Sequence, residues 1–362
     1  MDLQKLVEPL LSWYRKEHRA LPWRENKDPY RIWVSEIMLQ QTRVEAVKPY
    51  YFRFMERFPN VEELAEVQEE VLLKYWEGLG YYSRARNLKK AATIVMEEYQ
   101  GKMPDTYENL LKLPGIGSYT AGAIASIAFN RPVPAVDGNV LRILSRVRMD
   151  KESISNPKVK KRVEQELSEI MPTDAAGDFN QAMMELGATV CIPNGRAKCE
   201  ICPWNKMCLA KQYECVGEYP KKDVKKQRTI EKKTVLILKR ENKLALHKRS
   251  NKGLLAGMYE FPNIEGHLSK EEVLSALKEI GIYAVKIEAL EDSKHIFTHK
   301  EWHMKGYAIR VDELTEHSFE KTKIFFINVE DTKEEYPIPS AFAAYGKYIN
   351  ITLGSEGLKK DM

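Results

Sequence analysis

Four cysteines that lie close together near the middle of the chain constrain its fold more than any other feature. They have the spacing C-x7-C-x2-C-x5-C, and they are Cys191, Cys199, Cys202 and Cys208. Four thiolates with no histidine among them can ligate a zinc ion or an iron–sulfur cluster. The spacing disfavours zinc, because structural zinc sites usually combine two CxxC pairs and this run has one. Disulfides are the weaker alternative, because the sequence has five cysteines and nothing else in it indicates an oxidising compartment.

Length and charge set broader limits. A chain of 362 residues predicts about two domains. Its formal charge of +5 suits a polyanionic partner, and it equally suits a well-mixed solvated surface. The N-terminus lacks the apolar core of a signal peptide, and no apolar run is long enough to span a bilayer. We therefore expect a soluble, cytoplasmic, monomeric protein that contacts no membrane.

Helical periodicity dominates residues 1–215, and no long alternating stretch occurs there. The clearest predicted helices are Arg31–Arg43, Val61–Trp76, Arg84–Tyr99 and Lys158–Ile170. Residues 216–232 are rich in lysine and poor in apolar side chains, which is typical of a linker.

Residues 233–362 have a different sequence pattern, with short strand-like runs in place of helical periodicity. Thr234–Lys239 and Leu244–Lys248 predict a hairpin, and a capping box predicts a helix that begins at Ser269 and ends at Gly281. Further strands are predicted at Tyr283–Ala289, His303–Val311 and Lys323–Val329. The pattern predicts a mainly α first domain and an α/β or α+β second domain.

The segment Leu113–Gly117 (LPGIG) lies between two predicted helices, the first capped by Asp105 and the second spanning Ser118–Phe129. Two glycines allow a tight turn whose N–H groups can bind phosphate at a helix N-terminus. An ordinary helix–helix turn is the alternative. The flanking helices and the cysteine cluster downstream favour DNA binding instead. The expected contacts are Gly115, Gly117 and Ser118.

Two acidic residues are candidate catalytic groups. Glu36 lies in an apolar predicted helix, so we expect its carboxyl to be desolvated and protonated near neutrality. Asp137 precedes a helical stripe, so it is a plausible N-cap, and the capping N–H groups should keep it ionised. A proton donor and a persistent anion form the usual pair for cleaving a bond at an acetal-like sugar carbon. The alternatives without a catalytic role are a surface or paired glutamate for Glu36 and a purely structural helix cap for Asp137.

Taken together, the motifs resemble the MutY family of adenine DNA glycosylases, within the helix–hairpin–helix endonuclease III superfamily. The matching segments are LPWR at Leu21–Arg24, SEIMLQQT at Ser35–Thr42, GLGYYSRARNL at Gly78–Leu88, LPGIGSYTA at Leu113–Ala121, VDGNV at Val136–Val140 and FNQAMMELGATVC at Phe179–Cys191. The resemblance covers residues 10–210, and more weakly the rest. It implies a helical glycosylase region with an iron–sulfur loop, followed by a Nudix-like α+β domain.

The resemblance also implies a chemistry. It places a [4Fe–4S] cluster on the four cysteines, and it implies removal of adenine paired with 8-oxoguanine or guanine in double-stranded DNA. Glu36 would protonate the adenine, and Asp137 would stabilise the oxocarbenium-like sugar. Tyr119 and Asn139 match supporting catalytic positions. Relatives that nick DNA through an imine carry a lysine where this chain has Tyr119, and imine chemistry needs an amine. Base excision without an efficient lyase step is therefore expected.

Other positions are assigned by the resemblance alone. Near the extruded base these are Gln41, Thr42 and Tyr81 as DNA contacts, and Arg24, Leu39 and Gln181 as parts of the adenine pocket. In the second domain, Phe297, Thr298 and His299 match the loop that reads 8-oxoguanine. The helix Glu271–Gly281 lacks the glutamate pattern of a hydrolytic Nudix box, so no pyrophosphatase activity is expected.

Three departures from the family pattern are visible. The first cysteine gap has seven residues where six is usual, so Cys215 is a competing ligand. Thr298 replaces a serine, and Tyr259 replaces a tryptophan. Two alternative functions stay open at this point: an endonuclease III-like glycosylase and lyase for oxidised pyrimidines, and a non-catalytic zinc-stabilised DNA-binding protein.

Overall fold

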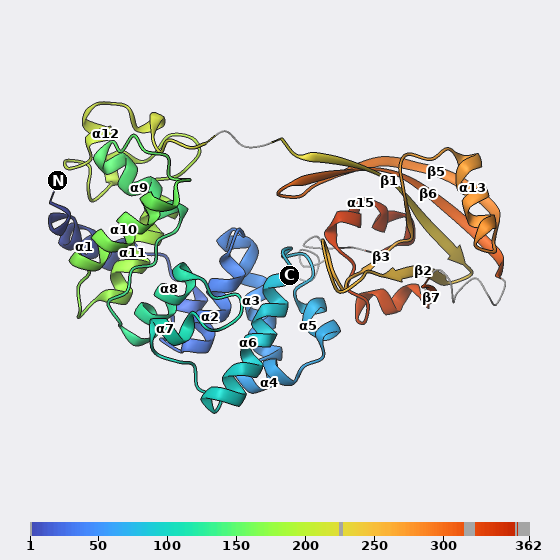
Figure 1. The fold of residues 1–362 in the computed structure, drawn as a ribbon, viewed down its shortest axis with the longest axis horizontal. Coiled ribbons are helices and arrows are strands. Elements are labelled where there is room, and N and C mark those ends of the chain that lie inside the picture. The colour runs from blue at the N-terminus through green and yellow to red at the C-terminus, as the bar shows by residue number, and fades with distance from the viewer. Residues whose placement is uncertain (1, 224–226, 315–322, 352, 354–362) are drawn as a thin grey trace. The chain divides into compact units, whose positions relative to one another are not determined.

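The computed structural model describes residues 2–223, 227–314, 323–351 and 353 (Figure 1). It divides into two compact units. The first comprises Met1–Val44, Met55–Glu66 and Asn87–Lys225, and the second comprises Glu45–Phe54, Val67–Arg86 and Lys226–Met362. The first unit is helical, and the second combines helical segments with a sheet. None of the helices among these described residues is long and apolar enough to cross a membrane.

The N-terminal half of the chain is built from helices and the loops that join them (Figure 1). They are α1 (Val7–Glu17), α2 (Pro29–Leu39), α3 (Val44–Arg57), α4 (Val61–Glu66), α5 (Glu69–Tyr75), α6 (Ser83–Tyr99), α7 (Tyr107–Leu110), α8 (Ser118–Phe129), α9 (Gly138–Arg148), α10 (Pro157–Ile170), α11 (Ala176–Thr189) and α12 (Leu209–Gln212).

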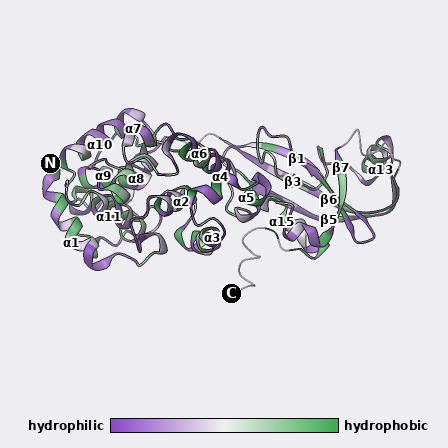
Figure 2. Ribbon diagram, turned by 90° about the horizontal axis from the view of Figure 1, so that it is seen from below, coloured by the Kyte–Doolittle hydropathy of each residue, from purple (hydrophilic) through white to green (hydrophobic). Residues whose placement is uncertain are grey.

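Helix α8 lies at the centre of the first unit. Its residues from Thr120 to Ile127 are all buried, and Figure 2 colours it mostly as hydrophobic. It packs against α2 and α11. It ends at Asn130, whose left-handed backbone (φ 51°) stops the helix and whose Oδ1 accepts a hydrogen bond from the N–H of Ala176 at the start of α11. Of these two neighbours, α2 carries the candidate site residues Glu36 and Leu39, and α11 carries Gln181.

Three details of the predicted helices are wrong. Helix α2 ends at Leu39 rather than Arg43, because Gln41 takes a left-handed backbone. The predicted helix Val61–Trp76 is two helices, α4 and α5. Asp105 does not cap α7, because Thr106 supplies the capping oxygen to the N–H of Asn109.

The second unit contains a seven-stranded sheet with strand order β3-β2-β1-β6-β5, to which β4 adds beside β1 and β7 beside β2. The strands are β1 (Thr229–Arg240), β2 (Lys243–Lys248), β3 (Tyr259–Glu260), β4 (Asn263–Glu265), β5 (Ile282–Ile296), β6 (Lys300–Leu314) and β7 (Ile324–Asn328). The β1–β2 hairpin is confirmed, and the β1–β6 pair is parallel. The predicted capping box of Ser269 and Glu272 begins α13 (Lys270–Glu279), as expected.

Both faces of β1 are buried, which explains its continuous apolar run. Val235 and Ile237 belong to one apolar cluster, and Leu236 and Leu238 belong to another. Residues of α13 cover the second cluster, whereas the first packs against α15 (Ala343–Gly346) and the short turn before it. Thr229 to Lys232, inside the predicted linker 216–232, are already part of β1 and pair with β6.

Candidate functional site

Glu36 lies on α2 with 5% of its surface exposed. Among the described residues, its Oε2 atom has no hydrogen-bond partner. Burial raises the pKa of this carboxyl from 4.5 to about 7, and hydrogen bonding from Tyr119 opposes the rise. The expected desolvation is therefore confirmed, and a large fraction of Glu36 carries a proton near neutral pH.

Asp137 caps α9, as predicted. Its Oδ1 accepts hydrogen bonds from the N–H groups of Asn139 (2.8 Å) and Val140 (2.9 Å), and its Oδ2 accepts one from Nδ2 of Asn139 (2.6 Å). Burial nevertheless raises the pKa of Asp137, although these donors and the Arg142 charge oppose it. The capping N–H groups thus lower the pKa of Asp137, in the direction that the sequence predicted, and burial, which the sequence did not reveal, acts against them.

Tyr119 brings the two carboxyl groups into one site. It is the second residue of α8, and both Glu36 and Asp137 interact with it electrostatically. Burial, followed by these two charges, raises the pKa of its hydroxyl, so it stays neutral. The hydroxyl contacts Sδ of Met184 on α11 at 3.6 Å. Helices α2 and α8 and the N-terminus of α9 thus place an acid, a hydroxyl and a capped carboxylate together.

Sequence reasoning missed Arg142, which is buried on α9. Its Nη2 donates to Oδ1 of Asn139 (2.9 Å) and to the carbonyl of Gly187 (2.9 Å), and its Nε donates to the carbonyl of Cys191 (3.0 Å). Gly187 has no space for a side chain, since a Cβ would lie 2.7 Å from Cβ of Asn139. One signal was available: Arg142 follows Asn139 by three residues inside an otherwise apolar helical stripe.

The three residues predicted to form the adenine pocket differ in their contacts and burial. Arg24 forms an ion pair with Glu185 on α11 (2.9 Å), and its charge lowers the pKa of Glu36. Glu185, which sequence reasoning missed, also binds Arg19 (2.6 Å) and is 1% exposed. Leu39 and Gln181 are half-buried on α2 and α11. Only Arg24 is thus connected electrostatically with the acid.

The predicted hairpin joins α7 and α8. Gly115 has φ 79°, and a Cβ there would lie 2.8 Å from Cβ of Asn87, so this tight turn requires glycine. Gly117 is exposed, and its hypothetical Cβ has no neighbour within 4 Å among the described residues, which leaves room for a ligand. Ser118 begins α8 and accepts a hydrogen bond from Nζ of Lys160 (2.8 Å). A lysine and a helix N-terminus therefore adjoin the exposed turn.

Gln41 and Tyr81 share an uncommon backbone. Both have positive φ, at 59° and 49°, and both are exposed. Large side chains are rarely held this way, and such positions concentrate at functional sites. Thr42 follows Gln41, is half-buried, and donates its N–H to the carbonyl of Leu39 (3.2 Å).

Within the second unit, the predicted lesion loop forms the turn between β5 and β6. The N–H of Phe297 donates to the carbonyl of Lys300 (2.9 Å). Phe297 is half-buried, whereas Thr298 and His299 are exposed. Oγ1 of Thr298 lies 3.0 Å from the hydroxyl of Tyr81. Tyr81, which the sequence assigned as a DNA contact, is therefore hydrogen-bonded to Thr298, which it assigned to reading 8-oxoguanine.

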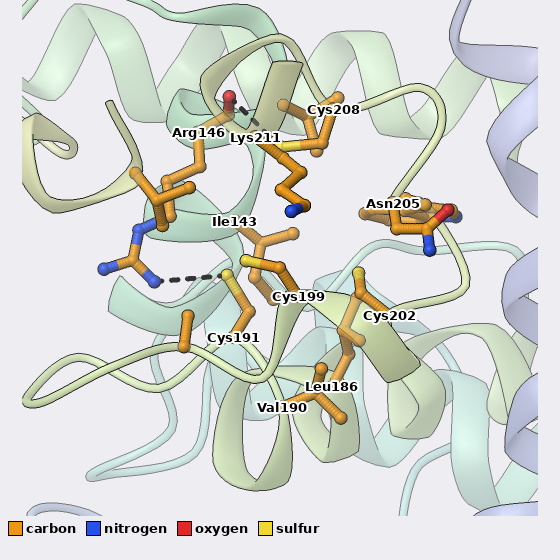
Figure 3. A pocket seen from close by; sticks show the side chains of 14 residues that line it. Ile143, Arg146, Leu186, Val190, Cys191, Cys199, Cys202, Asn205, Cys208 and Lys211 are labelled. Carbon is orange, nitrogen blue, oxygen red and sulfur yellow. Dashed lines mark hydrogen bonds between the residues drawn. The ribbon is translucent and has the colours of Figure 1, made fainter. Parts of the chain in front are cut away.

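The four cysteines of the sequence motif line one pocket (Figure 3). Cys215 does not belong to its lining. Figure 3 also shows Arg146, whose Nη1 donates to Sγ of Cys191 (3.3 Å). Sγ of Cys208 turns to the carbonyl of Arg146 (3.6 Å).

The side chains that line this pocket determine which kind of metal group it could hold. Among the residues that the structure describes, no three His, Cys, Asp or Glu side chains are grouped so that they could hold a single metal ion. Thiolates around one zinc ion lie within about 4 Å of one another. The four cysteines that share this pocket offer an all-thiolate donor set, which is the kind that holds iron–sulfur clusters.

Two known protein families match separate parts of this chain. The family model of the HhH-GPD superfamily of base excision DNA repair proteins matches residues 34–173, and a NUDIX domain model matches residues 234–347. An adenine DNA glycosylase of Buchnera aphidicola is 38% identical over 89% of this chain and 91% of the relative. The adenine DNA glycosylase of Mus musculus is 36% identical over 86% of this chain and 72% of the relative.

The chain belongs to the adenine DNA glycosylase family.

A solved structure supports the fold of the helical region. A thermostable thymine-DNA glycosylase matches with a TM-score of 0.52 and 28% identity, covering 58% of this chain and 97% of that chain. The predicted fold class is confirmed: a helix–hairpin–helix region followed by a Nudix-like α+β region. As a member of the adenine DNA glycosylase family, the protein is a DNA N-glycosylase.

The Nudix-like region of this glycosylase has a pocket beside α13. Ala276 and Leu277 of the helix line it, together with Ile280, which directly follows the helix. Three glutamates of the helix, Glu271, Glu272 and Glu279, are exposed instead. The face of α13 that borders the pocket therefore carries no carboxylate.

Proposed function

We propose that this adenine DNA glycosylase hydrolyses the N-glycosidic bond of adenine paired with 8-oxoguanine or guanine in duplex DNA. Glu36 donates its proton to the adenine as the bond between the base and C1′ breaks. Asp137 stabilises the positive charge that develops on the sugar, and water adds to C1′ while its proton passes to the Glu36 carboxylate, which restores the acid. The observation that carries the proposal is the buried Glu36 carboxyl, with its pKa near 7, in the same site as the capped Asp137.

Asn139, Tyr119 and Arg142 keep these two groups in place. Asn139 donates to Asp137, and Arg142 holds the amide oxygen of Asn139, so the amide can present only its NH2 group to the carboxylate. Tyr119 is a neutral donor between the two acids. These contacts support a preorganised site, in which charge stabilisation needs little rearrangement during the reaction.

The same residues support base excision without strand cleavage. A lyase step through an imine needs an amine at the reacting sugar. This chain has Tyr119 where relatives with lyase activity carry a lysine, and Nζ of Lys160, which reaches the hairpin, is bound to Ser118. We therefore favour a monofunctional glycosylase over a lyase.

Duplex DNA is the proposed partner, bound through the hairpin residues Gly115, Gly117 and Ser118 and through Gln41, Thr42 and Tyr81. An adenine inside a duplex must be rotated out of the stack before its glycosidic bond is accessible. The exposed, left-handed Gln41 and Tyr81 suit insertion into the stack. The adenine then occupies the pocket near Arg24, Leu39 and Gln181.

The loop Phe297, Thr298 and His299 is proposed to read 8-oxoguanine on the opposite strand. Its two exposed polar side chains offer donors and acceptors to a base edge, and Phe297 anchors it. The hydrogen bond between Thr298 and Tyr81 supports a shared role for these residues. The carboxylate-free face of α13 supports our proposal that the Nudix-like region does not hydrolyse pyrophosphates.

Cys191, Cys199, Cys202 and Cys208 are proposed to hold a [4Fe–4S] cluster. Such a cluster would crosslink the loop between α11 and α12 and thereby fix the end of the helical unit. Arg146 and Lys211, which also line the pocket, supply positive charge beside the anionic thiolates.

Release of adenine under single-turnover conditions tests the function. We expect base release from duplexes with adenine opposite 8-oxoguanine or guanine, and loss of at least about 100-fold in Glu36→Gln, because general acid catalysis typically contributes that much. Full activity in Glu36→Gln would refute the mechanism. Borohydride trapping of the wild type on the same duplex should give no major covalent adduct. A high yield would favour the lyase.

A further inference from the structure

We propose that Glu231, near the start of β1, is a positioning residue that orients the loop Phe297–His299 and thereby sets the preference for 8-oxoguanine over guanine. This inference rests on the proposed role of that loop. It assigns a specificity function to residues that the sequence alone placed in a linker.

The first residues of β1 lie directly beside the loop. The N–H of Thr229 donates to the carbonyl of His299 (3.2 Å). Thr229 pairs with Lys300 in the parallel β1–β6 register, and Glu231 pairs with Trp302. The end of the loop is therefore held by β1 as well as by its own hairpin. All of these contacts lie within the second unit.

Glu231 uses both of its carboxylate oxygens on this turn. Oε1 accepts from Nζ of Lys300, the residue that follows the loop, and Oε2 accepts from Nε1 of Trp302 (2.7 Å). The hydrogen bond from Lys300 lowers the pKa of Glu231, so the carboxylate is an anion at neutral pH. Hydrogen bonds to an ionised acceptor are stronger and more directional than those between neutral groups.

Trp302 carries this constraint to the loop. Its side chain is 1% exposed, and its ring packs against that of Phe297 at 4.9 Å between centroids and 70° between planes. The centroid of the same ring also lies 5.9 Å from that of Phe342. The indole N–H bond to Glu231 fixes the rotation of the ring, and the ring in turn fixes Phe297.

The contact between Phe297 and Trp302 affects the preference for 8-oxoguanine because it determines how the loop presents its polar side chains. While Phe297 stays packed on Trp302, the turn presents Thr298 and His299 to solvent. A base edge is read by hydrogen bonds whose strength falls steeply with misalignment. A loose anchor would weaken contacts made only by 8-oxoguanine, and it would leave the chemistry at the adenine unchanged.

The test compares Glu231→Gln with the wild type on two duplexes, with adenine opposite 8-oxoguanine and opposite guanine. For each duplex, the single-turnover rate is divided by the dissociation constant. The value for the 8-oxoguanine duplex, divided by the value for the guanine duplex, should fall about tenfold in Glu231→Gln, as for loss of one hydrogen bond to a charged group. The value for the guanine duplex should change less than about twofold, because the acid and the cap are untouched. Glu291→Gln is the matched control, since Glu291 on β5 pairs with Lys347 and lies outside the loop.

Hydrogen exchange supplies a second readout. Amides of residues 295–302 should exchange faster in Glu231→Gln, whereas those of α13 should not change. If Glu231→Gln fails to fold, Lys300→Gln removes one of the two bonds and serves as the second variant.

An unchanged ratio in both variants, or an equal loss on both duplexes, would overturn the inference. A wild type with no preference for 8-oxoguanine would instead refute the proposed function of the loop, and this inference with it. The two failures are distinguished by the wild-type measurement alone.

Discussion

Nη2 of Arg142 lies 2.9 Å from Oδ1 of Asn139. Asn139 in turn donates to Asp137, and Nε of Arg142 donates to the carbonyl of Cys191. The buried side chain of Arg142 and the half-buried side chain of Asn139 therefore connect the first cysteine of the motif with the carboxylate proposed to stabilise the sugar cation. These hydrogen bonds couple the conformation of the cysteine loop to that of the active site.

Arg142→Lys should slow adenine release while the protein stays folded. Lysine keeps the charge, but it cannot bind Asn139, Gly187 and Cys191 from one planar group. Hydrogen bonds involving charged groups contribute about 1.5–3 kcal/mol, so we expect a loss of about 10- to 100-fold in the single-turnover rate.

Arg148→Lys is the control for this experiment, because Arg148 lies on the same helix and pairs with Glu166 instead. Its rate should stay close to that of the wild type. A similar loss in both variants would show that charge or helix stability matters, rather than the connection through Asn139.

The rate of adenine release should depend on pH through Glu36. The acid acts in its protonated form, and its pKa is about 7. As pH rises above this value, the protonated fraction falls, so kcat/KM should fall by about tenfold per pH unit. At low pH, the rate should fall again as Asp137 becomes protonated, and the raised pKa of Asp137 moves this limb upward from the ordinary range. A profile that stays flat from pH 6 to 9 would argue against Glu36 as the acid.

The same carboxyl should make stability depend on pH. Its pKa is raised on folding, so the unfolded chain loses this proton first, and folding becomes less favourable as pH rises from 4.5 to about 7. A shift of this size corresponds to a loss of about 3 kcal/mol above pH 7. The free energy of unfolding of Glu36→Gln relative to the wild type should therefore be about 3 kcal/mol higher at pH 8 than at pH 4.

Comparing the two pH values removes any constant cost of placing an amide in this site. Glu62→Gln, at an exposed position on α4, should show no such difference. Chemical denaturation at both pH values measures it, and an equal effect at pH 4 and pH 8 would contradict the burial of the charge.

Local spacing explains what the sequence predicted well. The Asp137 cap and the Ser269 capping box join residues two or three apart, so their contacts follow from the helix itself. The β1–β2 hairpin depends on a short turn. The helical region, the cysteine pocket and the α+β character of the second unit were predicted for the same reason, together with the resemblance.

Long-range packing explains what the sequence did not show. Arg142 and Cys191 are 49 positions apart, and Arg19 and Glu185 are 166 apart, so nothing local indicates either contact. The parallel pairing of β1 with β6 turned part of the predicted linker into strand. The raised pKa of Asp137 depends on burial by other helices, which its own segment does not reveal.

Gly187→Ala should impair catalysis through Asn139. The added methyl would lie 2.7 Å from Cβ of Asn139, which is too close for any normal contact. Helix α11 or Asn139 must shift, and overpacking of this kind costs about 1–3 kcal/mol. We expect slower adenine release with nearly unchanged DNA affinity, measured by single-turnover kinetics and titration. Gly217→Ala, where the methyl meets open space, should behave like the wild type.

Iron content should distinguish the four pocket cysteines from the fifth. Cys199→Ser removes a proposed ligand, so it should lower iron bound per chain and the melting temperature of the helical unit, because a bound cluster stabilises the folded state. Cys215→Ser should retain the wild-type iron content, since Cys215 does not line the pocket. Elemental analysis and the visible absorption of iron–sulfur charge transfer measure both variants. Iron loss in Cys215→Ser with retention in Cys191→Ser would show that the longer first gap has moved the ligand set, and zinc in place of iron in the wild type would refute the cluster.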